Sequence, residues 1–313
     1  MQATDPVFVA GGETTIGRAI LRALERGGFR NVLAPKRAEL PLGDGRAVDA
    51  WMEANRPTVV IVAAGKSGGI GLNRRRPAEL MLDNLLVATS VLGAAARHGV
   101  ERLLYLASSC CYPKECPQPM RPEHLESGPL EPTSAAYATA KLAGIRLCQA
   151  LRTERSLQFV AGIPADVFGP DSSFDPEESH VIPALIARFH AAKLESLPEV
   201  SLWGSGNPRR EFLFADDLGD ACIAAIRGYN QEVPINLGGG AELSIREVAG
   251  MIAEVVGYQG RLAYDTSRPD GMPRKLLDSS VLMGLGWRPA TPFRDALEAT
   301  YRGFLATDGS RVG

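Results

Sequence analysis

Tyr137 and Lys141 are the residues whose types and spacing most directly suggest chemistry. They lie four positions apart in a stretch with helical periodicity, so their side chains share one helix face, about one turn apart. A lysine ammonium and the charge of a nearby nicotinamide favour the tyrosinate, so we expect the pKa of Tyr137 to be lowered. Such a phenol can exchange a proton with a carbonyl or hydroxyl group while a hydride moves. Because this spacing is common, an exposed helical pair without a catalytic role is the alternative.

Ser108 follows a predicted strand over residues 103–107. That position is the carboxyl edge of a parallel sheet, where ligands of such folds bind. A serine hydroxyl there can hydrogen-bond the same substrate oxygen as the phenol. The sequence therefore predicts a catalytic set of Ser108, Tyr137 and Lys141.

A glycine-rich turn, Gly11-Gly-Glu-Thr-Thr-Ile-Gly17, joins a buried strand over residues 7–10 to the first helix. Its glycines allow a tight turn, and the helix start offers unpaired N–H groups to a pyrophosphate. We therefore predict a nicotinamide dinucleotide here, although an ordinary strand–helix turn is the alternative. The predicted contacts from the turn and the end of the third strand are Gly11, Gly12, Thr14, Thr15, Ile16, Gly17 and Ala63.

The choice between NADP and NAD depends on the residues after the second strand. Lys36 and Arg37 stand there in place of the carboxylate typical of NAD sites, and an arginine suits a 2′-phosphate. Glu13 lies in the glycine turn and would repel that phosphate. NADP is favoured, NAD stays possible because of Glu13, and a solvated basic turn is the alternative for Lys36 and Arg37.

The elements that must position these residues alternate between strands and helices. Strands are predicted over residues 7–10, 32–34, 59–64, 103–107 and 159–163. Helices follow the glycine turn, surround Val48 and Trp51, and cover residues 77–98 and 134–155. Repeated units of this kind require right-handed crossovers. The predicted fold is α/β, a doubly wound parallel sheet of Rossmann type, with a smaller α/β substrate domain.

The character of the chain changes after residue 165, where prolines separate shorter elements. Strands are predicted over residues 200–203, 211–214 and 234–237, and helices over 182–193, 216–227 and 245–256. We predict a dinucleotide-binding domain at 1–165, with segments near 211–240 returning to it. The predicted substrate-binding domain comprises residues 166–210 and 241–313.

The composition is that of an ordinary soluble protein, with 45% apolar residues among 313 and a net charge of −2. Such a balance excludes a general nucleic-acid binder. The N-terminus lacks a basic signal region, and the longest apolar run, over residues 59–64, is too short to span a bilayer. Five cysteines show no metal-ligand spacing with histidine. We expect a reduced, cytoplasmic protein without a metal or a membrane contact.

Several longer motifs resemble the GDP-L-fucose synthase family of the extended short-chain dehydrogenase/reductase superfamily. They occur along nearly the whole chain in the family's order, and several are much more specific than the Tyr/Lys pair. The motifs are Lys66-Ser-Gly-Gly-Ile70, Ser108-Ser-Cys-Cys-Tyr-Pro113, Leu130-Glu-Pro-Thr133, Ser179-His-Val-Ile-Pro-Ala184, Trp203-Gly-Ser-Gly206, Arg210-Glu-Phe212 and Pro269-Asp-Gly-Met-Pro-Arg-Lys-Leu-Leu-Asp278.

The resemblance implies that Cys110 and His180 carry out an epimerisation beside the redox set. Protons next to a ketone are acidic, so a thiolate can remove one and an imidazolium can deliver one to the opposite face. Tyr137 would polarise the ketone, and NADPH would reduce it. Lys141 and His180 are also implied as cofactor contacts. For Cys110, a buried thiol with a packing role is the alternative.

The resemblance also implies substrate contacts. Arg188 and Arg210 match positions near a nucleotide diphosphate, where a guanidinium fits phosphate geometry. Lys275 and Trp203 match positions near the nucleotide or sugar. A solvated surface position is the alternative for each, and core packing is a further alternative for Trp203. The implied partner is a nucleotide sugar, and we expect a homodimer formed through long helices.

Four features depart from the family pattern. Thr14 replaces a glycine, Glu13 an arginine, Ala165-Asp166 a Thr-Asn pair and Phe168 a tyrosine. Asp166 accepts but cannot donate hydrogen bonds and would lie awkwardly near a diphosphate. These changes favour an active relative with an altered cofactor or sugar preference. An NAD-dependent sugar-nucleotide 4-epimerase or dehydratase, an epimerase/reductase of another nucleotide sugar, and a nucleotide sensor without turnover stay open.

Overall fold

A six-stranded parallel sheet forms the centre of the computed structural model, which describes residues 1–176, 178–267 and 270–308. Pro269, at the start of the last family-like motif, lies outside the described residues. The strand order is β10-β5-β4-β3-β1-β2, and every neighbouring pair is parallel. These strands are β1 (Val7–Ala10), β2 (Val32–Leu33), β3 (Val59–Val62), β4 (Arg102–Leu106), β5 (Gln158–Pro164) and β10 (Ile235–Leu237).

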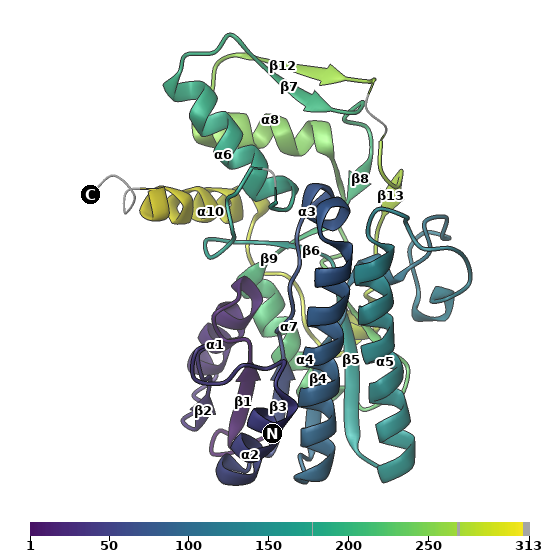
Figure 1. Ribbon diagram of the computed structural model, residues 1–313. Coiled ribbons are helices and arrows are strands. Elements are labelled where there is room, and N and C mark those ends of the chain that lie inside the picture. The colour runs from purple at the N-terminus through teal and green to yellow at the C-terminus, as the bar shows by residue number, and fades with distance from the viewer. Residues whose placement is uncertain (177, 268–269, 309–313) are drawn as a thin grey trace.

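Helices cover both faces of this sheet, as Figure 1 shows. On one face α1 (Thr15–Arg26) packs against α7 (Ala215–Gly228), and on the other α4 (Pro77–Arg97) lies between α2 (Gly45–Asn55) and α5 (Ala135–Arg155). Every residue of β1 and β3 is therefore buried, which explains their uninterrupted apolar sequences. The predicted doubly wound Rossmann-type fold is confirmed.

The strand order reverses between β1 and β3, because β2 pairs with one edge of β1 and β3 with the other. Ligands of doubly wound sheets bind at such a switch point, beyond the carboxyl ends of the strands. The glycine turn, Ala63 and Ser108 all follow strands of this part of the sheet. The fold therefore brings the predicted cofactor and catalytic residues to one edge.

A second, smaller core lies at one end of the molecule (Figure 1). It contains buried residues of α6 (Val181–Leu194), β7 (Glu199–Trp203), α8 (Ile245–Val256) and α10 (Phe293–Asp308). Strand β7 pairs in parallel with β12 (Arg261–Asp265). Phe168, one of the four departures, is buried in this core against Phe214 and Phe293.

Short elements connect the two cores. Strand β6 (Asp166–Phe168) pairs with β9 (Phe212–Phe214), and β8 (Arg209–Arg210) pairs with β11 (Leu243–Ser244) and β13 (Arg274–Lys275). The remaining elements are the helices α3 (Ile70–Arg75) and α9 (Ser280–Gly284) and the 3-10 turns η1 (Ser109–Cys111) and η2 (Pro122–His124).

The proposed domain division has support from the two cores but stays a prediction. Segment 211–240 contributes α7 and β10 to the large unit, in line with the expected return of the chain. Leu277, Leu282 and Trp287 come from the segment assigned to the substrate domain, yet they pack in the large core. The boundary near the C-terminus is therefore less simple than the sequence division.

Helix α4 is long and apolar enough to cross a membrane by length and composition alone, with a mean hydropathy of 1.3 over its most apolar window. Half of that window is buried inside the protein, where α4 packs along α5 and α2. The core helix of a soluble protein passes the same test. The helix is therefore weak evidence for a membrane span.

Candidate active site

The glycine turn is shaped by close backbone contacts. Gly11 has a φ of +91°, and a Cβ there would lie 2.7 Å from the Ala64 Cα. A Cβ on Gly17 would lie 2.0 Å from the Gly11 carbonyl oxygen. Both positions therefore require glycine. The resulting cradle at the start of α1 has the form that a pyrophosphate needs.

Thr14 fits this turn because its hydroxyl faces the protein. Its Oγ1 donates to the Gly11 carbonyl (2.9 Å) and the Ala63 carbonyl (3.2 Å) and accepts from the Gly17 N–H (2.9 Å). Thr14 is thus the N-cap of α1. The next residue, Thr15, donates to the Asp171 carbonyl at 2.8 Å and ties the turn to the segment after β6. The branched side chain therefore leaves the turn intact.

Glu13 is exposed, and its carboxylate accepts a hydrogen bond from the backbone N–H of Arg37 at 2.8 Å. Lys36 and Arg37 are exposed after β2. This contact joins the turn after β1 to the turn after β2, the two segments that flank the adenosine ribose in folds of this class. Glu13 and the two cationic residues Lys36 and Arg37 therefore lie on these two neighbouring turns.

The predicted catalytic set gathers at the carboxyl end of β4. Lys141 is buried, and its Nζ donates to the Leu106 carbonyl at 3.1 Å. The half-buried Tyr137 phenol faces the Ser108 hydroxyl. Ser108 also caps η1, because its Oγ accepts from the Cys110 N–H at 3.2 Å. Three elements, β4, η1 and α5, therefore position the set.

The protonation of this set differs from the sequence expectation. Burial raises the pKa of Tyr137, the nearby Cys110 raises it further, and Ser108 opposes the shift only in part. Burial lowers the pKa of Lys141 to about 8. The pKa of Tyr137 is therefore raised in this structure, opposite to the expected lowering, because loss of hydration on burial is the largest effect. A protonated phenol is the form that can donate a proton during reduction.

Cys110 lies beside an ion pair, buried on its lysine side, that sequence reasoning missed. Lys275 is 8% exposed, and its Nζ lies 2.8 Å from the Asp166 Oδ1 and 3.8 Å from the Cys110 Sγ. Lys275 therefore contacts the predicted epimerisation base as well as the carboxylate. Asp166, expected to lie awkwardly near a diphosphate, is neutralised by this partner.

His180 is the N-cap residue of α6 and shares these charges. His180 is exposed to solvent, yet desolvation by the surrounding protein lowers the pKa of its imidazole. The Asp166 carboxylate raises that pKa, and the Lys275 ammonium lowers it. Cys110, His180, Tyr137 and the ion pair thus belong to one electrostatic group.

Among the predicted substrate residues, Arg210 lies near the ion pair, whereas Arg188 contacts β7 and Trp203 ends that strand. Arg210 lies close enough to Asp166 and Lys275 to influence both charges, and its guanidinium donates to the carbonyls of Met272 (2.6 Å) and Arg209 (2.8 Å). Arg188 instead donates to the Ser201 carbonyl at 2.6 Å. Trp203, at the end of β7, is 63% exposed, so the core-packing alternative is wrong.

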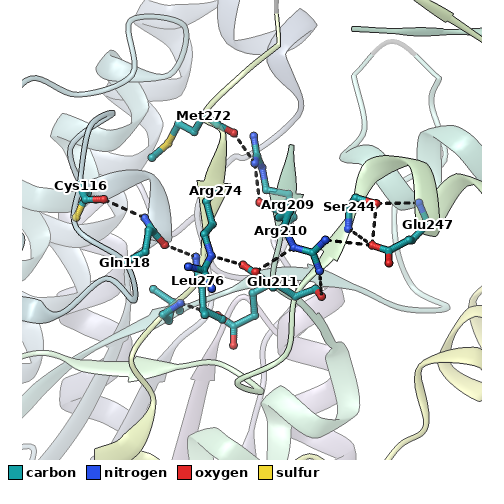
Figure 2. A network of polar contacts seen from close by, with 12 residues as sticks. Cys116, Gln118, Arg209, Arg210, Glu211, Ser244, Glu247, Met272, Arg274 and Leu276 are labelled. Carbon is teal, nitrogen blue, oxygen red and sulfur yellow. Dashed lines mark hydrogen bonds and ion pairs between the residues drawn. The ribbon is translucent and has the colours of Figure 1, made fainter. Parts of the chain in front are cut away.

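A polar network holds β13, and with it Lys275, against β8 (Figure 2). The buried Glu211 carboxylate accepts from the backbone N–H groups of Leu277 (2.8 Å) and Gly240 (2.7 Å). The side-chain Oε1 of Gln118 accepts from the Leu276 N–H at 2.9 Å. Burial raises the pKa of Glu211 to about 7, despite these hydrogen bonds. Glu211 lies within the Arg210-Glu-Phe212 motif, but nothing in that motif predicts its role in supporting the site.

Comparisons with known proteins agree with this geometry. Residues 7–238 match the model of the NAD dependent epimerase/dehydratase family. The chain is 46% identical to GDP-L-fucose synthase 1 of Arabidopsis thaliana, over 96% of this chain and 93% of the relative. It is 42% identical to GDP-L-fucose synthase of Escherichia coli (strain K12), with 96% of each chain covered.

A solved structure of a GDP-L-fucose synthetase from Naegleria fowleri bound to NADP is also similar. It superimposes with a TM-score of 0.89 and 26% identity, over 99% of this chain and 97% of that chain. The resemblance drawn from the sequence motifs is therefore confirmed. The chain belongs to the NAD dependent epimerase/dehydratase family and, within it, to the GDP-L-fucose synthase group.

Proposed function

We propose that the protein is an NADP(H)-dependent epimerase/reductase that converts GDP-4-keto-6-deoxymannose to GDP-L-fucose. The observation that carries this proposal is that Cys110 lies next to the Lys275 ammonium and interacts electrostatically with the Tyr137 phenol. A reductase alone needs Ser108, Tyr137 and Lys141. A thiol held 3.8 Å from an ammonium supplies a base for a second reaction, and the relatives of 42–46% identity support the same assignment.

The epimerisation uses Cys110 and His180. The Cys110 thiolate takes a proton from a carbon next to the ketone, and the electron pair moves to the ketone oxygen to give an enolate. The Tyr137 phenol and the Ser108 hydroxyl hydrogen-bond that oxygen and stabilise its charge. The His180 imidazolium then donates a proton to the opposite face of the carbon. The redox state of the sugar is unchanged by these steps.

The reduction uses side chains of the same group. The cradle of Gly11 and Gly17, Thr14 as helix cap, Ile16, Ala63 and the cations after β2 fit a nicotinamide dinucleotide, with Gly12 and Thr15 in the same turn. NADPH, when bound, supplies a hydride. Tyr137 donates its proton to the sugar oxygen, and the Lys141 ammonium behind the set stabilises the tyrosinate that is left. With a pKa of about 8, Lys141 is largely protonated at neutral pH.

The substrate residues have matching roles in this proposal. Arg210 and Arg188 bind the diphosphate, and Trp203 contacts the nucleotide or the sugar. We also propose that the protein is a homodimer located in the cytoplasm. The exposed Leu82 and Leu86 on α4 support an interface through the long helices, and light scattering on the purified protein tests it.

Turnover tests the proposed function directly. Purified protein mixed with GDP-4-keto-6-deoxymannose should oxidise NADPH and yield GDP-L-fucose, identified by NMR. Tyr137→Phe should abolish NADPH oxidation, while leaving NADPH binding intact. No oxidation of either NADPH or NADH with this sugar would exclude the substrate assignment.

A further inference from the structure

The pair of Asp166 and Lys275 contacts Cys110 through the lysine and interacts electrostatically with His180, the two groups that the proposed epimerisation needs. Lys275 Nζ is 2.8 Å from the Asp166 carboxylate and 3.8 Å from the Cys110 sulfur. Its side chain is 9% exposed, and that of Asp166 is 32% exposed. Because the pair is shielded on the lysine side, its charges act strongly on their neighbours.

Several charged and titratable groups face this pair. Burial raises the pKa of Asp166, but Lys275, Arg210 and His180 outweigh it, so that the pKa is lowered overall. For Lys275, burial lowers the pKa, and Asp166 and Cys110 reverse that shift despite the charge of Arg210. The Asp166 carboxylate also raises the pKa of Tyr137 and the pKa of Glu211. Both members of the pair are therefore charged at neutral pH.

We propose that Asp166 and Lys275 are positioning residues that set the charges of the epimerisation pair, Lys275 by stabilising the Cys110 thiolate and Asp166 by stabilising the His180 imidazolium. This inference rests on the proposed function. The family resemblance implies an asparagine at this position, so the negative charge of Asp166 is a departure of this chain from the family pattern. An amide could hold Lys275 through a hydrogen bond, but it would not counter the ammonium charge.

The two charges have opposite effects, which makes the proposal testable. Without the Asp166 carboxylate, the uncompensated ammonium favours the thiolate, and His180 loses a stabilising anion. Both groups should then release their protons at lower pH. Without the Lys275 ammonium, the thiolate loses its partner, and the remaining carboxylate favours the imidazolium. Both groups should then release their protons at higher pH.

The experiment measures two titrations in the absence of substrate. The first is the rate of iodoacetamide alkylation of Cys110 against pH, followed by peptide mass spectrometry because the chain has five cysteines. The second is the NMR titration of His180, assigned among four histidines with an H180Q spectrum. D166N should move both midpoints down by about one pH unit, and K275M should move both up by about one unit. The D166N/K275M double variant should return both midpoints toward wild type.

A matched control removes a carboxylate from an exposed ion pair elsewhere. Asp49 pairs with Arg97 at 2.8 Å, and D49N should leave the Cys110 and His180 midpoints unchanged. Midpoints that stay in place in D166N and K275M, or that move in the same direction in both, would overturn the inference. If one single variant does not fold, as judged by circular dichroism, the other single variant and the double variant still decide between these outcomes.

The titrations separate this inference from the proposed function. Opposite shifts together with no turnover of GDP-4-keto-6-deoxymannose would support the ion pair and reject the substrate. Normal turnover together with unmoved midpoints would support the function and reject the ion pair as the source of these charges.

Discussion

Replacing Glu13 by arginine should raise the preference of the protein for NADPH over NADH by about tenfold. The Glu13 carboxylate is held on the Arg37 N–H at 2.8 Å, between the two turns that flank the adenosine ribose. A unit charge about 4 Å from another contributes ~1 kcal/mol in water, and the substitution changes the charge by two units beside a phosphate. Salt screening reduces the total to about 1–2 kcal/mol, equivalent to about 5- to 30-fold in the ratio of dissociation constants.

Fluorescence titration of the protein with each reduced cofactor measures this ratio without turnover. E13Q, which removes only the negative charge, should give a smaller change in the same direction. E25R makes the same charge change near the far end of α1, at another exposed position, and should leave the ratio within twofold of wild type. An E13R ratio equal to that of wild type would refute the placement of Glu13 beside the 2′ position.

Two further predictions concern stability. Glu211 has a pKa of about 7 in the folded protein against an ordinary 4.5. Its protonation therefore stabilises the fold fully below pH 4.5, and this contribution is lost as the pH rises to about 7. Urea unfolding should show wild-type stability falling by up to about 3 kcal/mol over that window relative to E211Q; parallel profiles for the two proteins would contradict this. Thr14→Val removes the N-cap of α1 and should lower the free energy of unfolding by about 1–2 kcal/mol, whereas Thr14→Ser keeps the cap and should cost much less. Equal stabilities of the two Thr14 variants would show that the hydroxyl contributes nothing.

The large sheet and its helices were predictable because their patterns are local. Strands buried on both faces are uninterrupted apolar runs, and α1 shows a clear apolar stripe. Helix α10 was not predicted, because its buried stripe of Ala296, Thr300 and Phe304 includes a polar residue. Thr300 is tolerated in the core since its hydroxyl donates to the Ala296 carbonyl at 2.7 Å. The two-residue strands β8, β11 and β13 depend on tertiary pairing and carry no signal of their own.

Part of the candidate site was also predictable from local patterns, and part of it depends on tertiary pairing. Tyr137 and Lys141 share a helix, and Ser108 ends a strand, so their approach follows from the fold. Asp166 and Lys275 are separated by 109 positions, and only the pairing of β13 with β8 brings them together. The protonation of Tyr137 was mispredicted because its burial depends on packing that no spacing rule describes.

Exchange of substrate protons with deuterium tests the central claim most directly. GDP-4-keto-6-deoxymannose is incubated with the protein and NADP⁺ in D₂O, so that epimerisation can proceed without reduction, and NMR follows the carbons next to the ketone. The wild type should incorporate deuterium at both carbons, and Cys110→Ser should not, although it binds NADPH normally. Undiminished incorporation by Cys110→Ser, or none by the wild type, would contradict the assignment of Cys110 as the base of an epimerase/reductase.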